Sequence, residues 1–350
     1  MTGRHETVTQ RPWQRWRWTR WLADNGVSTR SAGLVIGVLL LQLGFIASYL
    51  AAFHEPKPHE IAVAVTSAQT ATQLNALPGD PVKAEVYATD AAARQAIEDR
   101  NAYGAYLNGA QSDTLLVAGA NGSTLSLALA DIFTQVNKQT GRPLVVTDIK
   151  PLPNGDPRGL SGFYLIVGWT VGGYLVASAL SISVGSRPAN SKRAGVRLAA
   201  LAIYSVVSGI AGTAVSYWIV GGMPHHYVPL AAMGALLVFG VGATTMALQV
   251  VSSILGIGLA VLLFVILGNP SAGGAYPSPL LPGFWRAIGP WLPPGAGMSA
   301  FRGIVYFGNA KIGFPLLVLA GYALVGTAGT LLFAARRPKV ADAIDEFGTD

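Results

Sequence analysis

"LLPGFWRAIGPWLPPG", residues 280–295, combines features that do not belong together in an ordinary solvated loop. Four prolines and three glycines interrupt any long helix, yet the stretch holds two tryptophans and only one charged residue, Arg286. Non-helical backbone at membrane depth is tolerated only where protein buries it or water reaches it. The stretch therefore predicts a broken hairpin, within residues 269–313, that dips into the outer leaflet and covers the end of a helix bundle.

Within this hairpin, "FWRAIG" and "GMSAFRGIVYF" are expected to form short helical pieces separated by "PWLPPG". The tryptophans would sit at the headgroup level, and Arg286 and Arg302 would extend toward lipid phosphates. A solvated loop with interfacial tryptophans is the alternative. The residues predicted to form this outer gate are Phe284, Trp285, Arg286, Pro290, Trp291, Pro293 and Pro294.

The composition points to a membrane protein. The chain has 350 residues, of which 51% are hydrophobic and only 12% charged, whereas a soluble domain carries about 25% charged residues. Cysteine is absent from the sequence. That absence excludes a disulfide framework, a thiolate metal site and a cysteine nucleophile.

A membrane-spanning helix needs about 20 apolar residues, and the sequence predicts six of them. The stretch between Arg197 and Arg286 contains no Asp, Glu, Lys or Arg and divides at a turn cluster (221–229) and at a short polar dip (248–253). A single helix over 228–268 would be about 60 Å long, roughly twice a membrane's thickness. The predicted spans are 32–53, 161–184, 198–220, 228–248, 251–268 and 314–335. The first is expected to be an uncleaved anchor rather than a signal peptide, because it exceeds the usual apolar length of signal peptides.

Basic residues are concentrated in the segment 1–31, in the loop 185–197 and in the tail 336–350. The positive-inside rule therefore places both termini in the cytoplasm, as an even number of spans also requires. We expect a multi-pass protein of the cytoplasmic (inner) membrane. Region 54–160, with eight basic and eleven acidic residues, would lie outside the cell.

Region 54–160 reads as a small mixed α/β domain. Alternating apolar residues predict strands at 60–65 and 82–88, and further strands at 114–120 and 142–153. Helical periodicity predicts helices over 90–104 and 121–141, the second ending at a glycine. Taken with the six spans, the expected fold class is an α-helical integral membrane protein with an α/β extracytoplasmic domain between its first two spans.

The segment "RPWQRWRWTRWLADN" (11–25) is the most concentrated amphipathic pattern in the chain. Tryptophan prefers the headgroup layer and arginine binds anionic lipid, so a helix lying on the inner leaflet is favoured. A nucleic-acid patch is the alternative, but the segment lies within about ten residues of a span, and we predict no nucleic-acid partner. The residues predicted to face membrane lipid are Trp13, Arg15, Trp16, Arg17 and Trp21.

The spans carry no ionisable residue at their centres, which disfavours a transporter driven by an ion gradient. The chain also contains no G-x-x-x-x-G-K-[ST] motif, so nucleotide-driven work would need a partner. "HEPKPHE" (54–60) has the wrong spacing and two prolines, so no metal site is expected there. We predict no catalytic residue, no metal and no cofactor. Gly168 and Gly172, four residues apart, favour close packing of another helix, either within the chain or along a seam between subunits.

Three stretches carry a family resemblance: "FHEPKPHEIAVAV" (53–65), "FYLIVGWTVGGYL" (163–175) and "LGNPSAGGAYPSPLLPGFWRAIGPWLPPGAGMSAFRGIVYF" (267–307). With their order along the chain they resemble permease subunits of ABC-2 type exporters, in the YhgE/Pip-like or nitrosoguanidine-resistance-like branch. The resemblance implies a homodimer or heterodimer of permeases that binds a separate ATPase subunit. It also implies that the basic loop couples to that ATPase through Arg187, Lys192, Arg193 and Arg197.

Two functions remain open from the sequence. One is export of a hydrophobic or amphiphilic compound with energy from the partner ATPase. The alternative is a membrane scaffold without transport activity, whose extracytoplasmic domain binds an envelope or secretion partner.

Overall fold

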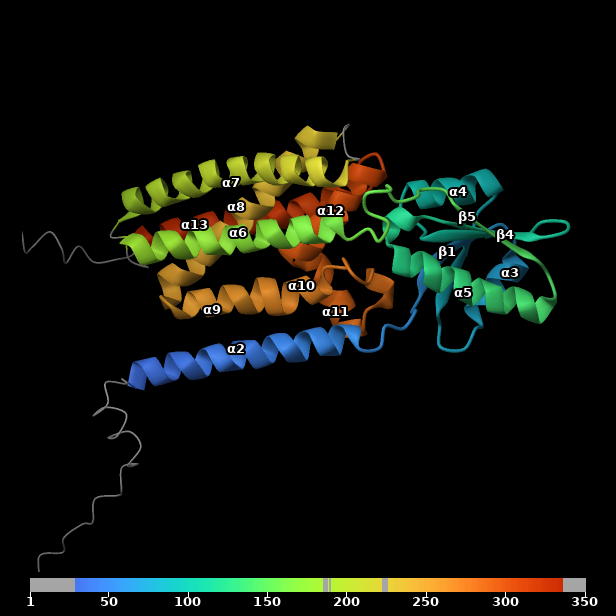
Figure 1. The fold of residues 1–350 in the computed structure, drawn as a ribbon, viewed down its shortest axis with the longest axis horizontal. Helices are drawn as coiled ribbons and strands as arrows, with labels where there is room; N and C mark the ends of the chain where they lie inside the picture. The colour runs from blue at the N-terminus through green and yellow to red at the C-terminus, as the bar shows by residue number, and fades with distance from the viewer. Residues whose placement is uncertain (1–28, 185–187, 189, 222–225, 336–350) are drawn as a thin grey trace, which may run out of the picture.

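The computed structural model describes residues 29–184, 188, 190–221 and 226–335. These residues form a helix bundle with an α/β domain at one end of it (Figure 1). The predicted Trp/Arg helix in segment 11–25, Arg187 and the predicted cytoplasmic tail 336–350 lie outside the described residues.

Five described helices are long and apolar enough to cross a membrane. The chain is therefore mostly helical and has the segments of a membrane protein, as its composition predicts. The helices are α2 (Thr29–Phe53), α6 (Ser161–Val184), α7 (Ser191–Val220), α8 (Tyr227–Ser252) and α13 (Gly313–Ala335).

The predicted division of 228–268 into two helices is confirmed. Helix α8 ends at Ser252, and Ser253, with φ of 57°, turns the chain at the predicted polar dip. The next apolar helix, Leu255–Ser271, is shorter than the five above. It consists of α9 (Leu255–Val261), the π-helical segment η3 (Leu262–Leu267) and α10 (Gly268–Ser271).

The prediction of a basic loop over 185–197 is wrong for residues 191–197, which are helical. Helix α7 begins at Ser191, because the Asn190 side chain accepts a hydrogen bond from the Arg193 backbone N–H at 2.9 Å and caps the helix. Lys192, Arg193 and Arg197 therefore lie in the first two turns of α7 rather than in a loop.

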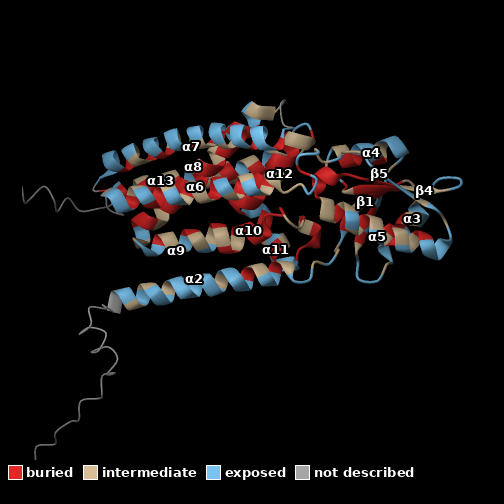
Figure 2. Ribbon diagram, viewed as in Figure 1, coloured by how far each residue is buried: buried red, intermediate tan, exposed pale blue. Residues whose placement is uncertain are grey.

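Helix α8 is the centre of the bundle. It packs against α6, α7 and α13, and 67% of its most apolar 18-residue segment is buried. Helix α2 is the opposite case, since only 6% of its most apolar 18-residue segment is buried. It runs along the edge of the bundle beside α9 (Figures 1 and 2).

Glycines allow close contacts between helices, although Gly168 is not one of them. A Cβ on Gly173 would lie 2.8 Å from the Val238 carbonyl oxygen, and one on Gly326 would lie 2.6 Å from the Ala243 carbonyl carbon. A Cβ on Gly168, by contrast, would meet no atom within 4 Å. The prediction that Gly168 packs against another helix of this chain is thus wrong. Gly172 does approach another helix, since a Cβ there would lie 3.1 Å from the hydroxyl oxygen of Tyr204 on α7.

The proline-rich region folds into a broken hairpin. It comprises η4 (Ser278–Leu280), α11 (Gly283–Ile288), η5 (Gly289–Trp291) and α12 (Pro293–Tyr306). Pro293 and Pro294 were predicted to lie between two helices, but they are the first two residues of α12. At these positions the missing N–H groups cost no hydrogen bond. Helix α12 is buried along most of its length among α6, α8 and α13 (Figure 2).

The α/β domain contains a five-stranded mixed sheet in the order β2-β1-β3-β4-β5. Strand β1 is parallel to β2 and β3, β3 is antiparallel to β4, and β4 is parallel to β5. The elements are β1 (Ile61–Val65), α3 (Ala68–Asn75), β2 (Val82–Val86), α4 (Asp90–Glu98), β3 (Gly104–Leu107), β4 (Asp113–Val117), η1 (Gly119–Asn121), α5 (Ser123–Thr140) and β5 (Leu144–Asp148). The four predicted strands and two predicted helices are present, whereas α3 and β3 had not been predicted.

The hairpin holds both faces of this domain. Leu280 joins the apolar cluster that α3 and α5 form on one face of the sheet. Phe307, just after α12, joins the cluster that α4 forms on the other face. The hairpin therefore packs against both faces of the sheet.

A buried carboxylate, that of Asp113, joins several elements at one end of the domain by hydrogen bonds. Asp113, with a fully buried side chain, accepts hydrogen bonds from Tyr106 at 2.7 Å, from Asn137 at 2.9 Å and from Arg142 at 2.8 Å. The Arg142 guanidinium lowers the pKa of Asp113 to about 2. Burial and the hydrogen bond to Asp113 together raise the pKa of Tyr106.

This cluster predicts acid sensitivity of the domain. Because the pKa of Asp113 is lower in the folded state than in the unfolded state, its contribution is complete above about pH 4 and is lost as the pH falls through about 2. We expect a loss of about 2 kcal/mol of unfolding free energy between these values. Pulse proteolysis of the full chain with pepsin in urea would measure it. Asp113→Asn should lack this part of the pH dependence, and an unchanged slope in that variant would contradict the assignment.

Candidate functional site

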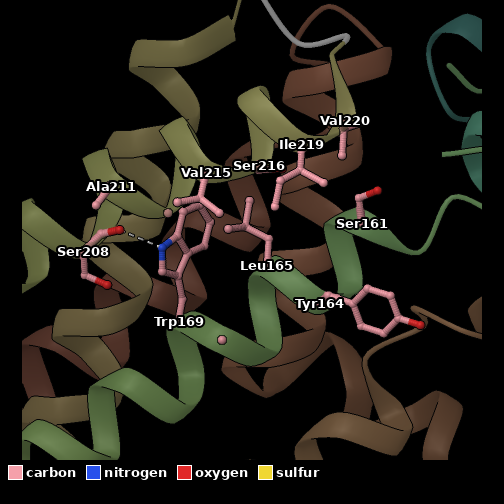
Figure 3. Close-up of a pocket in the computed structure, with 12 residues that line it drawn as sticks. Ser161, Tyr164, Leu165, Trp169, Ser208, Ala211, Val215, Ser216, Ile219 and Val220 are labelled. Carbon is pink, nitrogen blue, oxygen red and sulfur yellow. Dashed lines mark hydrogen bonds between the residues drawn. The ribbon is translucent and has the colours of Figure 1, made fainter. Parts of the chain in front are cut away.

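An apolar groove lies between α6 and α7 (Figure 3). It has a volume of about 520 Å³ and occupies the half of the two helices nearer the α/β domain. Its lining residues are small or apolar, with a few hydroxyls, and none is charged. They are Ser161, Tyr164, Leu165, Gly168, Trp169, Ser208, Ala211, Gly212, Val215, Ser216, Ile219 and Val220.

Trp169 lies at the base of the groove. Its indole N–H donates to the Ser208 carbonyl oxygen across the helix pair at 3.0 Å, so the polar end of the ring is satisfied (Figure 3). The ring fits because glycines flank it on two helices. A Cβ on Gly212 of α7 would lie 3.0 Å from the indole Cε2 atom, and one on Gly234 of α8 would lie 2.6 Å from Cη2.

The groove is open at Gly168. The space above this residue is empty, and the side chains of Tyr164 and Ile219 at the rim are 64% and 73% exposed. A groove with such a rim on the outside of a helix pair admits a molecule from the side, along the plane of a membrane.

The chemistry of the groove is that of an apolar binding site. Such sites are mostly hydrophobic, with a few polar groups that orient the ligand. The Ser216 hydroxyl is such a group, since it is buried and has no hydrogen-bond partner among the described residues. The groove therefore suits a hydrophobic compound that carries a neutral hydrogen-bonding group.

The first two turns of α7, which hold the predicted coupling residues Lys192, Arg193 and Arg197, lie at the end of the bundle away from the domain (Figure 1). Lys192 and Arg193 are exposed in the first turn of α7. Cations are disfavoured at a helix N-terminus, where the helix dipole is positive. An anionic surface brought to this end, from a partner protein or from lipid headgroups, would offset that cost.

The predicted gate residues separate into two groups. Phe284 and Trp291 are 58% and 63% exposed, so they are free to contact lipid. Trp285 is buried against Ala52 and Leu281, so protein covers its ring. Pro293 and Pro294 are also buried, whereas Pro290 is exposed and Arg286 is half-buried.

Arg302 does not reach outward to the surface of the bundle, as its predicted extension toward lipid phosphates required. Its side chain is buried, and its guanidinium donates to the Gly273 carbonyl oxygen at 2.8 Å. The reason is that α12 enters the bundle instead of lying across its end, which turns this residue inward.

Comparison with protein-family models, with curated proteins and with solved structures gives no match for this chain. The groove is therefore assigned from its geometry alone.

Sequence reasoning did not identify the groove. Trp169 carried a signal, because an indole N–H in the middle of an apolar span has to find an acceptor. The acceptor, Ser208, is 39 residues away, and the glycines that admit the ring belong to two other helices. No periodicity within one helix brings these residues together.

Proposed function

We propose that the chain is the permease subunit of an ABC-2 type exporter, which moves a hydrophobic or amphiphilic compound out of the cell with energy from a separate ATPase subunit. The observation that carries the proposal is the uncharged groove between α6 and α7, built around Trp169 and open at Gly168. A permease for apolar compounds needs such a site, reachable from within the bilayer.

The energy would come from outside this chain. Between residues 198 and 285 the sequence has no Asp, Glu, Lys or Arg, and the spans at 31–53, 161–184 and 313–335 have none either. Proton and sodium relays use ionisable groups inside the bundle. The exposed basic turn of α7 is the surface that an ATPase would contact, with Lys192 and Arg193 as its first cations and Arg197 one turn further on.

We propose six crossings, with Leu255–Ser271 as the fifth. At 1.5 Å per residue this helix is about 26 Å long, close to the hydrocarbon thickness of about 30 Å. Helix α2 begins, and α13 ends, at the end of the bundle away from the domain (Figure 1). That arrangement supports an even number of crossings, with both termini in the cytoplasm and the α/β domain outside the cytoplasmic membrane.

We further propose that two permeases pair, as a homodimer or a heterodimer. Helix α2 offers a long apolar surface that the described part of the chain leaves uncovered, including Val35, Val38 and Leu40, each more than 60% exposed. Lipid, a second permease or both would cover this surface.

The test is whether an ATPase is bound and required. The tagged full chain, purified in a mild non-ionic detergent, should bring down a P-loop ATPase, and Lys192→Glu combined with Arg193→Glu should release it. Lys57→Glu combined with Lys83→Glu, on the domain, is the matched control. If the wild-type chain brings down no ATPase, or the α7 variant retains it fully, the proposal fails.

One observation favours the scaffold function as the second candidate. Strand β5 is an edge of the sheet, and Val145 and Val146 on it are 49% and 45% exposed. Such an edge accepts a strand from another protein. Under this alternative, Val145→Lys would abolish capture of the partner while the α7 charge reversal would leave activity intact.

A further inference from the structure

A second cavity lies where the α/β domain meets the hairpin. It has a volume of about 210 Å³, and residues of the domain, the loop before α11, α12 and the start of α13 line it. Its lining includes the side chains of Arg100, Tyr103, Asn121 and Arg302.

Two arginines enter this cavity from opposite sides of the junction. Arg100 comes from the turn after α4 and donates to the Ser299 and Ala310 carbonyl oxygens at 3.0 and 3.2 Å. Arg302 comes from α12, is 8% exposed and donates to the Gly273 carbonyl oxygen. Among the described residues, neither guanidinium has a carboxylate within ion-pair distance.

Two like charges without a counter-ion are unfavourable here, because Arg302 is buried and Arg100 is half-buried. Removing a guanidinium from water costs free energy that carbonyl dipoles return only in part. The two positive charges also repel each other, because the guanidiniums line the same cavity. Burial lowers the pKa of Arg100, which expresses the same cost.

Asn121 adds an unsatisfied donor to the same cavity. Its side chain is 3% exposed, and its Nδ2 has no hydrogen-bond partner among the described residues. Buried polar groups are nearly always hydrogen-bonded in native proteins. The Tyr103 side chain also lines the cavity and interacts electrostatically with both arginines.

We infer that this cavity binds an oxyanion of the phosphate class, held by the guanidiniums of Arg100 and Arg302 and the side-chain amide of Asn121. The donors come from separate elements, the turn after α4, helix α12 and the end of η1. A tetrahedral anion accepts hydrogen bonds from several directions at once, and arginine forks match phosphate oxygens. The anion would also tie the domain to the hairpin. This inference does not depend on the export function.

Two sources share this chemistry, a free phosphate and the headgroup of a phospholipid. The first experiment measures the melting temperature of the delipidated full chain in dodecyl maltoside, with sodium phosphate against sodium chloride at equal ionic strength. Saturating phosphate should raise the melting temperature by about 3 °C or more.

Asn121→Asp is the decisive variant. It keeps the size of the side chain and places a carboxylate beside the two arginines. We expect it to raise the melting temperature without phosphate and to remove the response to phosphate. Arg302→Gln should also remove the response, although it could weaken folding. Arg94→Gln, at an exposed arginine of α4, is the matched control and should respond like the wild type.

The second experiment distinguishes the sources. Native mass spectrometry of the gently purified chain should show one retained phospholipid on the wild type and on Arg94→Gln, but none on Asn121→Asp, if a headgroup is the ligand. A phosphate response without a retained lipid would indicate a free phosphate. The inference is overturned if the wild type shows neither, or if Asn121→Asp behaves as the wild type does in both experiments.

Discussion

Gly326→Leu is expected to leave little folded protein, whereas Gly321→Leu, five residues earlier on α13, is expected to be tolerated. A Cβ on Gly326 would lie 2.6 Å from the Ala243 carbonyl carbon and 2.9 Å from the Thr244 Cα atom, both in the backbone of α8. Backbone cannot move aside as a side-chain end can. Overpacking commonly costs about 1–3 kcal/mol or more, and here the contact joins the central helix to α13.

Gly321 is the matched position because a Cβ there would meet nothing within 4 Å. Leucine also favours a helix over glycine by roughly 1 kcal/mol, so Gly321→Leu should be neutral or slightly stabilising. Thermal unfolding in a mild detergent, followed by size-exclusion chromatography, would compare the two. Equal stability of both variants would show that α13 does not approach α8 at Gly326.

Under the proposed export function, Gly168→Phe should strongly reduce export without unfolding the chain. The space above Gly168 is empty and belongs to the groove, so the new ring would occupy the volume that a ligand needs. We expect the efflux rate to fall by about tenfold or more, a barrier increase of about 1.4 kcal/mol or more. Efflux of neutral lipophilic dyes, with Nile red as reference, would measure it in cells that express the chain together with the ATPase recovered in the pull-down proposed above.

Gly321→Phe is the control for this variant, since it places the same ring on an open face of α13, away from the groove. It should export dye at the wild-type rate. The melting temperatures of both variants should match the wild type, which separates a blocked groove from a damaged fold. Wild-type efflux by Gly168→Phe would show that the compound takes another route.

The secondary structure followed largely from local patterns. Composition and apolar length predicted the five long helices. The short polar stretch at 248–253 predicted the turn at Ser253. Turn and cap signals gave α4 and α5 of the domain, the second ending at Gly141 in the left-handed conformation. The two missed elements, α3 and β3, are short, with eight and four residues, and too few residues repeat in them for a period to be visible.

The burial of particular residues could not be read in the same way. Trp285 and Trp291 are both tryptophans in one apolar stretch, yet the first is 7% exposed and the second 63%. The difference comes from Ala52 of α2 and Leu281, which cover one ring and not the other. In a membrane segment both sides of a helix are apolar, so hydrophobicity does not indicate which side faces protein.

By itself, the sequence determined that this chain is built from membrane-length helices with an α/β domain after the first, because helix and strand periods and apolar length are local properties. Only the tertiary structure decided which glycines meet backbone and which lie open, where Trp169 finds its acceptor, and that Arg302 faces Arg100 across a cavity. These features join residues up to about 200 positions apart. Their energies come from packing and burial between helices, which no single stretch of sequence contains.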